Sequence, residues 1–323
     1  MSPPLVSVII PCRNGAAWLG EAIESCLGQS WTRLEIIAVD DASTDGSRDV
    51  ARRYEGRGVI ALDSPRRGAS AARNVGLEHS HGDFVQFLDA DDVLDRDKIR
   101  VQIERLAVAP DGAIASGAWA RFGGQPGEAA FAAEPVWRDF SPPEDFLIAS
   151  WLGGGMMANF GWLTPRALIE RAGPWDEALS LVDDGEYFCR VLLVASAVVF
   201  CGDARGFYRS AIVPGLSRRR DRAALLSAFT AIDQSCRRLL ERNDSLAAKK
   251  ACATQYLRFA YDTYPQARDL VARAERHAGE LGGSELQAGG GRAFQILAKS
   301  VGWKFGKHCQ RAWHHLKARG AGA

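Results

Sequence analysis

The chain has 323 residues, of which 47% are hydrophobic and 24% charged, proportions that suit a globular protein and exclude a disordered or low-complexity chain. The net charge of +1 conceals an asymmetry, because residues 1–215 contain 20 Lys+Arg and 30 Asp+Glu whereas residues 216–323 contain 20 and 9. The acidic first part excludes a nucleic-acid groove there, since phosphates require a basic surface.

The seven cysteines are scattered and form no C-x-x-C pair, which favours reduced thiols over a disulfide framework or a zinc site. The start of the chain lacks a basic and apolar signal region. The longest near-apolar run, Val191–Cys201, is too short to cross a bilayer. These features predict a cytoplasmic protein.

Short β-branched runs alternate with helical stretches through residue 118, and this alternation predicts strands joined by crossover helices. The order indicates an α/β fold with a mostly parallel, Rossmann-like sheet and helices on both faces. The expected strands are Val6–Ile10, Leu34–Val39, Val59–Leu62 and Asp83–Leu88, and the expected helices are Ala16–Leu27, Ser47–Tyr54 and Ala69–Glu78.

Polar residues follow three of these strands at their carboxyl ends, where ligands bind in open α/β sheets. Asp40 and Asp41 end the second strand, and Asp41 either accepts a hydrogen bond from a base or caps a helix. Asp89 and Asp91 follow the fourth strand. Their carboxylates suit Mg²⁺ or Mn²⁺, and the structural alternative is a solvated turn.

From residue 119 to 215 the pattern is less regular and predicts a second half of the same domain. Asp183 and Asp184 open an expected helix over Asp183–Ala195. They either complement the helix dipole or provide a general base that faces the crevice. Trp162 is the tryptophan that we expect to stack on a sugar ring, and its structural alternative is a large core residue. Arg209 is a candidate contact for the donor diphosphate and for the sugar or acceptor.

Residues 216–323 predict a basic helical extension. Within it, residues 292–319 carry seven Lys and Arg and no acids, with apolar residues at near-helical spacing. Such a basic amphipathic helix can rest on an anionic membrane surface, here the inner membrane face, and can equally dock on its own protein or on a partner.

The motifs, taken in order, resemble family 2 glycosyltransferases, which are inverting enzymes with the GT-A fold. The resemblance covers roughly residues 5–215. It rests on five segments of the sequence: Val6-Ser-Val-Ile-Ile-Pro11 with Arg13-Asn14, Val39-Asp-Asp-Ala-Ser-Thr-Asp45, Gly68-Ala-Ser-Ala-Ala-Arg73-Asn74-Val-Gly76, Asp89-Ala-Asp-Asp92 and Asp183-Asp-Gly-Glu-Tyr-Phe-Cys-Arg190.

This resemblance implies a GT-A domain over 1–215, with a nucleotide-binding half over 1–118 and an acceptor half over 119–215. It implies that Asp91 binds Mn²⁺ or Mg²⁺ and that Asp184 is the general base, with Asp183 beside the acceptor. It also implies that the nucleotide contacts Pro11, Arg13, Asn14, Asp41, Arg73, Asn74 and Asp89.

The expected reaction is the transfer of a sugar from a nucleoside diphosphate donor, a UDP-sugar, to a hydroxyl of a saccharide or lipid-linked acceptor in cell-surface polysaccharide or glycoconjugate synthesis. The family's late histidine has no counterpart, because no histidine lies between His81 and His277. A dinucleotide oxidoreductase would require G-x-G-x-x-G after the first strand, where Pro11-Cys-Arg-Asn-Gly15 stands instead. The remaining alternatives are another nucleotide-sugar enzyme and a non-catalytic nucleotide-binding module.

Overall fold

The computed structural model describes residues 2–210, 219–287, 289, 294, 300 and 302–308. The chain forms two compact units, residues 1–217 and 218–323, which are considered separately. The predicted site residues all belong to the first unit, so its sheets and helices determine their geometry.

A five-stranded sheet in the order β3-β2-β1-β4-β7 forms the base of the first unit. The strands are β1 (Val6–Cys12), β2 (Leu34–Asp40), β3 (Val59–Asp63), β4 (Phe84–Phe87) and β7 (Thr164–Pro165). The first four pair in parallel and β7 pairs antiparallel with β4. The predicted mostly parallel α/β sheet is therefore confirmed.

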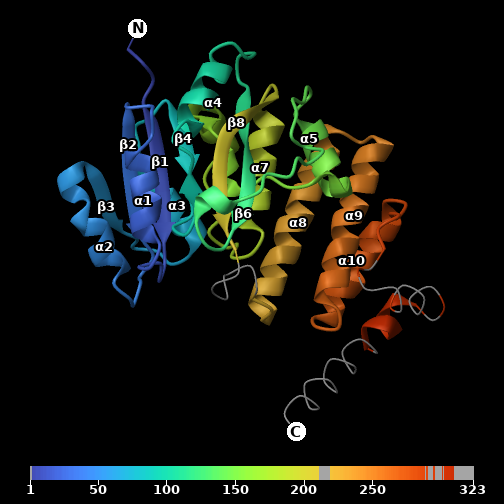
Figure 1. Ribbon diagram of the computed structural model, residues 1–323. Helices are drawn as coiled ribbons and strands as arrows, with labels where there is room; N and C mark the ends of the chain where they lie inside the picture. The colour runs from blue at the N-terminus through green and yellow to red at the C-terminus, as the bar shows by residue number, and fades with distance from the viewer. Residues whose placement is uncertain are drawn as a thin grey trace. The chain divides into compact units, whose positions relative to one another are not determined.

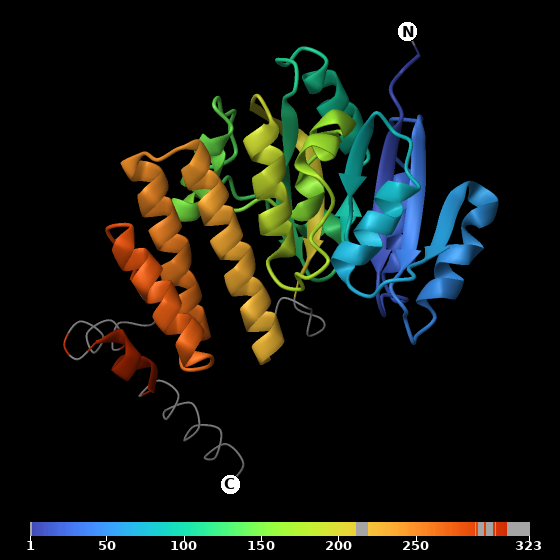
Figure 2. The same ribbon diagram turned by 180° about the vertical axis from the view of Figure 1, so that it is seen from behind.

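Three crossover helices join these strands: α1 (Leu19–Leu27), α2 (Ser47–Arg53) and α3 (Ala69–Glu78). Helices α1 and α3 lie on opposite faces of the sheet, as the two views show (Figures 1 and 2). The side chains of β2 alternate accordingly, because Ile36 and Ala38 belong to the main apolar core while Ile37 and Val39 pack with residues of α3. Burial on both faces explains the continuous apolar runs of these strands.

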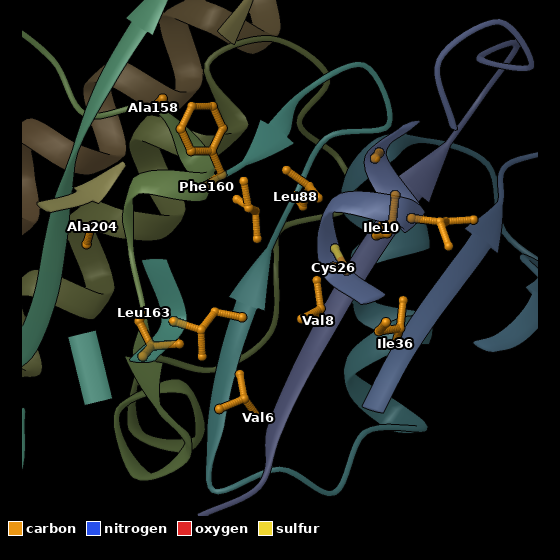
Figure 3. Packing of buried hydrophobic residues seen from close by; sticks show 14 of the residues in the cluster. Val6, Val8, Ile10, Cys26, Ile36, Leu88, Ala158, Phe160, Leu163 and Ala204 are labelled. Carbon is orange, nitrogen blue, oxygen red and sulfur yellow. The ribbon is translucent and has the colours of Figure 1, made fainter. Parts of the chain in front are cut away.

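The main core extends from the parallel sheet into the second half of the unit (Figure 3). Val8 and Ile10 of β1 share this cluster with Leu88, while Phe160 and Leu163 come from a segment more than seventy residues further along the chain. One continuous core thus joins the two predicted halves of the domain.

A second sheet, in the order β5-β8-β6, was not predicted. Its strands are β5 (Val93–Leu94), β6 (Ile114–Phe122) and β8 (Val198–Arg209), and α4 (Lys98–Leu106) packs on it. The register between β6 and β8 shifts at Gly117 and Ala118. Such a bulge interrupts the strict alternation that identifies a strand in a sequence.

Among the described residues, the rest of the first unit contains α5 (Glu144–Ala149), α6 (Arg166–Ala172) and α7 (Asp183–Val194). The short helical turns are η1 (Glu55–Arg57), η2 (Pro126–Glu128), η3 (Ser150–Gly154) and η4 (Asn159–Gly161). Helix α7 confirms the expected helix after the acidic motif, and its Tyr187 and Phe188 are buried.

The second unit contains α8 (Arg222–Arg242), α9 (Leu246–Thr263) and α10 (Arg268–Glu280), as the predicted helical extension requires. Asp221 and Ser245 cap the first two helices by accepting hydrogen bonds from backbone N–H groups. Most of residues 292–319, the expected basic amphipathic segment, lie outside the described residues. Within the described part of the chain, no helix combines the length and the apolar character that a membrane crossing requires.

Candidate active site

The loops that follow β1 and β2 are joined by hydrogen bonds at the carboxyl ends of these neighbouring strands. The backbone N–H of Asn14 donates to Ser43 Oγ at 2.9 Å, and Asn14 Oδ1 accepts from the N–H of Thr44 at 2.8 Å. Asn14 has a φ of 53°, and Ala42 has a φ of 50°. Two non-glycine residues in the left-handed region show that this edge is built for a particular loop shape.

Asp41, the expected base-binding residue, is 3% exposed and lies where the β2 loop meets the loop before α3. Its Oδ1 accepts from the N–H of Gly68 at 2.9 Å, and Arg13 Nη1 lies 3.8 Å from its Oδ2. Gly68 has a φ of 115°, a conformation that side chains other than glycine rarely adopt. Asp41 therefore joins a backbone N–H and a half-exposed guanidinium at the carboxyl end of the parallel sheet.

Arg73 connects the β4 loop to the start of α7. Its Nη2 donates to Asp89 Oδ1 at 2.8 Å and its Nη1 donates to Asp183 Oδ2 at 2.9 Å. The side chain is only 7% exposed, so these ion pairs lie in a poorly hydrated environment and are screened less than surface pairs. Ser70 on the same helix also donates to Asp183, at 3.1 Å. Asp89 and Asp183, which lie 94 positions apart in the sequence, thus both bind the guanidinium of Arg73.

Asp91 differs from Asp89, because its carboxylate accepts no hydrogen bond from another residue in the described part of the chain. Withdrawal from bulk water, together with the negative charge of Asp89, raises the pKa of Asp91 to about 6, although one face of the residue remains open to solvent. The neighbouring Asp92 is 2% exposed, and burial together with the charges of Asp89 and Asp91 raises its pKa well above the usual value. Three carboxyl groups are therefore crowded together at this turn.

Asp184 is half-buried at the first turn of α7. Burial and the negative charge of Asp183 raise the pKa of Asp184 to about 6, while the positive charge of Arg73 opposes that increase. One carboxylate oxygen accepts from the N–H of Gly185 at 2.8 Å. Asp183 is held by Arg73, so Asp184 is the carboxylate of this pair that is available for proton transfer.

Three of the predicted site residues pack against or hydrogen-bond to other parts of the protein, so their predicted contacts with a ligand are corrected. Trp162 is 3% exposed and packs against Phe146 and Phe188, with ring centroids 5.1 and 5.5 Å away. The expectation that it stacks on a sugar is wrong, because neither face of the ring is open. Asn74 is also corrected, since its amide pairs with the main chain of Trp175, as described below.

Arg209 is the third correction. Its side chain is 9% exposed, and its Nε donates to the carbonyl oxygen of Asp91 at 2.9 Å. Its guanidinium also pairs with Glu21 and lies 4.4 Å from the ring centroid of Phe122. Arg209 therefore holds the Asp91 turn in place instead of reaching the acceptor.

No sequence motif indicates Asn159, which lies beside Asp89. Its Nδ2 donates weakly to Asp89 Oδ1, at 3.4 Å, and the residue is 6% exposed. It lies in η4, a single turn whose position depends on contacts with distant segments. Trp175 is a second residue that the sequence motifs did not identify, and its ring covers the guanidinium of Arg73, whose central carbon lies 4.4 Å from the ring centroid.

The residues at the turn are compatible with a bound divalent cation. Carboxylate oxygens are hard ligands, and an unpartnered carboxylate beside a second negative charge is stabilised by a cation. Among the described residues, no group of three His, Cys, Asp or Glu side chains is arranged to hold a metal. Asp91 would therefore bind a cation together with oxygens from the substrate and water, as Mg²⁺ sites commonly do.

The fold has counterparts among solved structures. It is similar to that of S. aureus TarS 1–349 in complex with UDP-GlcNAc, with a TM-score of 0.66, 15% identity, and coverage of 86% of this chain and 80% of that one. The mannosyltransferase PcManGT from Pyrobaculum calidifontis, in complex with GDP-Man and Mn²⁺, aligns with a TM-score of 0.55, 20% identity, and coverage of 93% and 80%. The chain therefore has the GT-A fold.

Residues 7–162 match the family described as Glycosyl transferase family 2, in agreement with the resemblance that the sequence motifs predict. The putative teichuronic acid biosynthesis glycosyltransferase TuaG of Bacillus subtilis is 42% identical over 104 residues, which are 31% of this chain and 41% of TuaG. The chain spans less than two thirds of the length of this and other curated relatives that it matches.

Proposed function

We propose that the chain transfers a sugar from a nucleoside diphosphate donor to an acceptor hydroxyl, with inversion at the anomeric carbon. The observation that carries this proposal is the bridge made by Arg73, which brings Asp89 and the Asp183-Asp184 pair to one end of the sheet. A carboxylate suited to ribose hydroxyls and a carboxylate suited to proton transfer then lie on either side of one crevice.

The donor side is formed by the loops after β1, β2 and β4. We assign Asp41 to the base, Asp89 to the ribose, and the backbone near Pro11 together with Arg13 to the flanks of the nucleotide. Asn14 contributes by fixing the loop, because its amide oxygen already accepts from Thr44. Arg73 acts on the nucleotide through Asp89, whose orientation it holds.

Asp91 would hold Mn²⁺ or Mg²⁺. When bound, the cation would neutralise negative charge on the leaving diphosphate. Arg209 supports the same turn, since it binds the carbonyl oxygen of Asp91 and its N–H donates to Asp92 Oδ1 at 2.9 Å.

Asp184 takes the proton of the acceptor hydroxyl as that oxygen attacks the anomeric carbon. The bond from this carbon to the diphosphate oxygen breaks on the opposite face, so one displacement inverts the configuration. The pKa of about 6 suits a base that is ionised at neutral pH and still accepts a proton in the transition state. Asp183 accepts a hydrogen bond from Arg73 and orients the first turn of α7.

Two structural neighbours were solved with different nucleotide sugars, UDP-GlcNAc and GDP-Man. Both support a nucleoside diphosphate donor, and we propose a UDP-sugar. The similarity to TuaG supports a role in cell-surface polysaccharide synthesis, with a saccharide or lipid-linked saccharide as acceptor.

The test is a screen of UDP- and GDP-sugars with Mn²⁺ or Mg²⁺, which measures thermal stabilisation and release of nucleoside diphosphate.

Asp91→Ala should abolish metal-dependent donor binding. Asp184→Asn should retain binding and lose about 10²–10⁴ in kcat. Asp203→Ala is the control, because that side chain is 86% exposed and lies outside the crevice loops. Donor binding without diphosphate release would indicate a non-catalytic nucleotide-binding module, and full turnover by Asp184→Asn would remove it as the base.

A further inference from the structure

We propose that Asn74 and Trp175 are positioning residues that hold the first turn of α7, and with it Asp184, against the nucleotide-binding half. The expected kinetic effects depend on the proposed function. The structural part of the inference does not: it is that Asn74 and Trp175, which lie 101 positions apart, form a clamp through their hydrogen bonds.

The clamp begins with the amide of Asn74, which is 5% exposed. Its Oδ1 accepts from the N–H of Trp175 at 2.8 Å, and its Nδ2 donates to the carbonyl oxygen of Trp175 at 2.9 Å. The second hydrogen of Nδ2 is directed to Glu177 Oε1, also at 2.9 Å. With both amide hydrogens and the oxygen engaged, Asn74 binds the Trp175 backbone as a neighbouring strand would.

The ring of Trp175 continues the connection towards α7. Tyr187 stacks on it with centroids 3.9 Å apart and planes 7° from parallel, and the guanidinium of Arg73 lies over the Trp175 ring. Phe87 packs edge-on against both rings, with its centroid 5.1 Å from that of Trp175 and 5.8 Å from that of Tyr187. Tyr187 lies three residues after Asp184, so the position of this buried ring sets the position of the helix start.

The backbone immediately before the acidic pair supports the same conclusion. Val182 has a φ of 63° and a ψ of 22°, left-handed values that a β-branched residue adopts only under constraint. Such a conformation persists only where the surroundings fix it. The clamp at Trp175 and the ion pair between Arg73 and Asp183 fix the segment at both of its ends.

The kinetic test compares Asn74→Ala with Gln29→Ala. Gln29 is the matched control, because it is 6% exposed and its amide also makes three hydrogen bonds to the protein, to Ser25, Asp95 and Ile99. Both variants should lower Tm. Asn74→Ala should also lower kcat for donor hydrolysis by about 10- to 100-fold, because a misplaced base is a poor base, with the KM for the donor unchanged.

A rise in donor KM at unchanged kcat in Asn74→Ala would overturn the proposal, since it would make Asn74 a nucleotide ligand. An equal loss of kcat in Gln29→Ala would overturn it too, because general destabilisation would then explain both variants. If Asn74→Ala does not fold, the near-isosteric Asn74→Asp serves, since it retains the acceptor for the N–H of Trp175 and loses the donor.

Hydrogen exchange separates this inference from the proposed function. The backbone amides of residues 183–190 should exchange faster in Asn74→Ala than in Gln29→Ala, whether or not a donor is turned over. Equal exchange in the two variants would overturn the clamp. Absence of turnover by the wild-type protein with every donor would overturn the proposed function alone.

Discussion

The ionised carboxylates of Asp91 and Asp184 lower the stability of the fold, although the proposed activity requires them to be ionised. Asp91 and Asp184 each have a pKa near 6 in the folded chain, above the value of an unfolded aspartate. The folded state therefore binds protons more readily than the unfolded state, so each group lowers stability progressively between about pH 4 and pH 6, and the full destabilisation is present above pH 6. The crevice retains ionised carboxylates at the expense of stability, a pattern common at functional sites.

One prediction concerns the Tm of Asp184→Asn. The substitution removes a carboxylate that is crowded by Asp183 and Asp89, so Tm should rise at pH 8 by a few degrees relative to the wild type. The difference should shrink towards pH 5, where the wild-type carboxyl is already protonated in the fold. Calorimetry at both pH values measures this, and a lower Tm at pH 8 would contradict the raised pKa.

A second prediction concerns activity against pH. Because a general base must be ionised, kcat should fall about tenfold for each pH unit below 6 and reach a plateau above it. Asp91 titrates in the same range, so donor binding is measured separately, as the Kd of the nucleotide at each pH. A kcat that stays constant between pH 5 and 7 would exclude Asp184 as the base.

At the scale of elements, a buried polar network fixes η4 beside the crevice. Lys98 of α4 is fully buried, and its Nζ donates to Gln86 of β4 and to Gln102. The two glutamines donate in turn to the carbonyl oxygens of Phe160 and Gly161, at 2.9 and 2.8 Å. Because Asn159 opens the same turn, this network determines where it lies relative to Asp89.

Burial lowers the pKa of Lys98 to about 7, far below the value of an unfolded lysine. Between pH 7 and 10 the unfolded state binds the extra proton, so this group increases stability as the pH rises. We predict that the free energy of unfolding rises more steeply over this range in the wild type than in Lys98→Met. Urea unfolding at pH 7 and pH 9.5 provides the comparison, and parallel changes would show that Lys98 is charged throughout.

The strands and crossover helices of the first 118 residues could be predicted because each strand is a short apolar run bounded by polar loops. The second sheet could not, because β6 reads Ile-Ala-Ser-Gly-Ala-Trp-Ala-Arg-Phe, a sequence rich in weak strand formers. Its burial comes from pairing with β8, some eighty residues away. Packing contacts override local preference at such positions.

The candidate site divides in the same way. Asp41, Asp89 and Asp91 could be placed together because the ends of parallel strands share an edge. The partners of Asn74, Trp162 and Arg209 could not be predicted, since each contact joins residues from distant parts of the chain. An amide or a guanidinium in a motif is equally able to bind a ligand or a backbone, and only the fold decides between them.

For the whole molecule, the division into residues 1–217 and 218–323 matters most, because the crevice loops and their supports all lie in the first unit. We predict that a chain ending at Ser217 unfolds cooperatively and binds a nucleoside diphosphate with the Kd of the full chain. Calorimetry and titration of the nucleotide check the two parts. Aggregation of the fragment, or a Kd raised tenfold or more, would show that the basic helical unit is required.

The stacked rings of Trp175 and Tyr187 have a practical consequence for redesign. They form a joint between the segment that faces the nucleotide and the segment expected to select the acceptor. A chimera that takes its second segment from a related protein must therefore also import an aromatic pair of the same size, or the transplanted helix will present its carboxylate at a different angle. Under the proposed function, acceptor preference can be exchanged only together with the buried residues that support it.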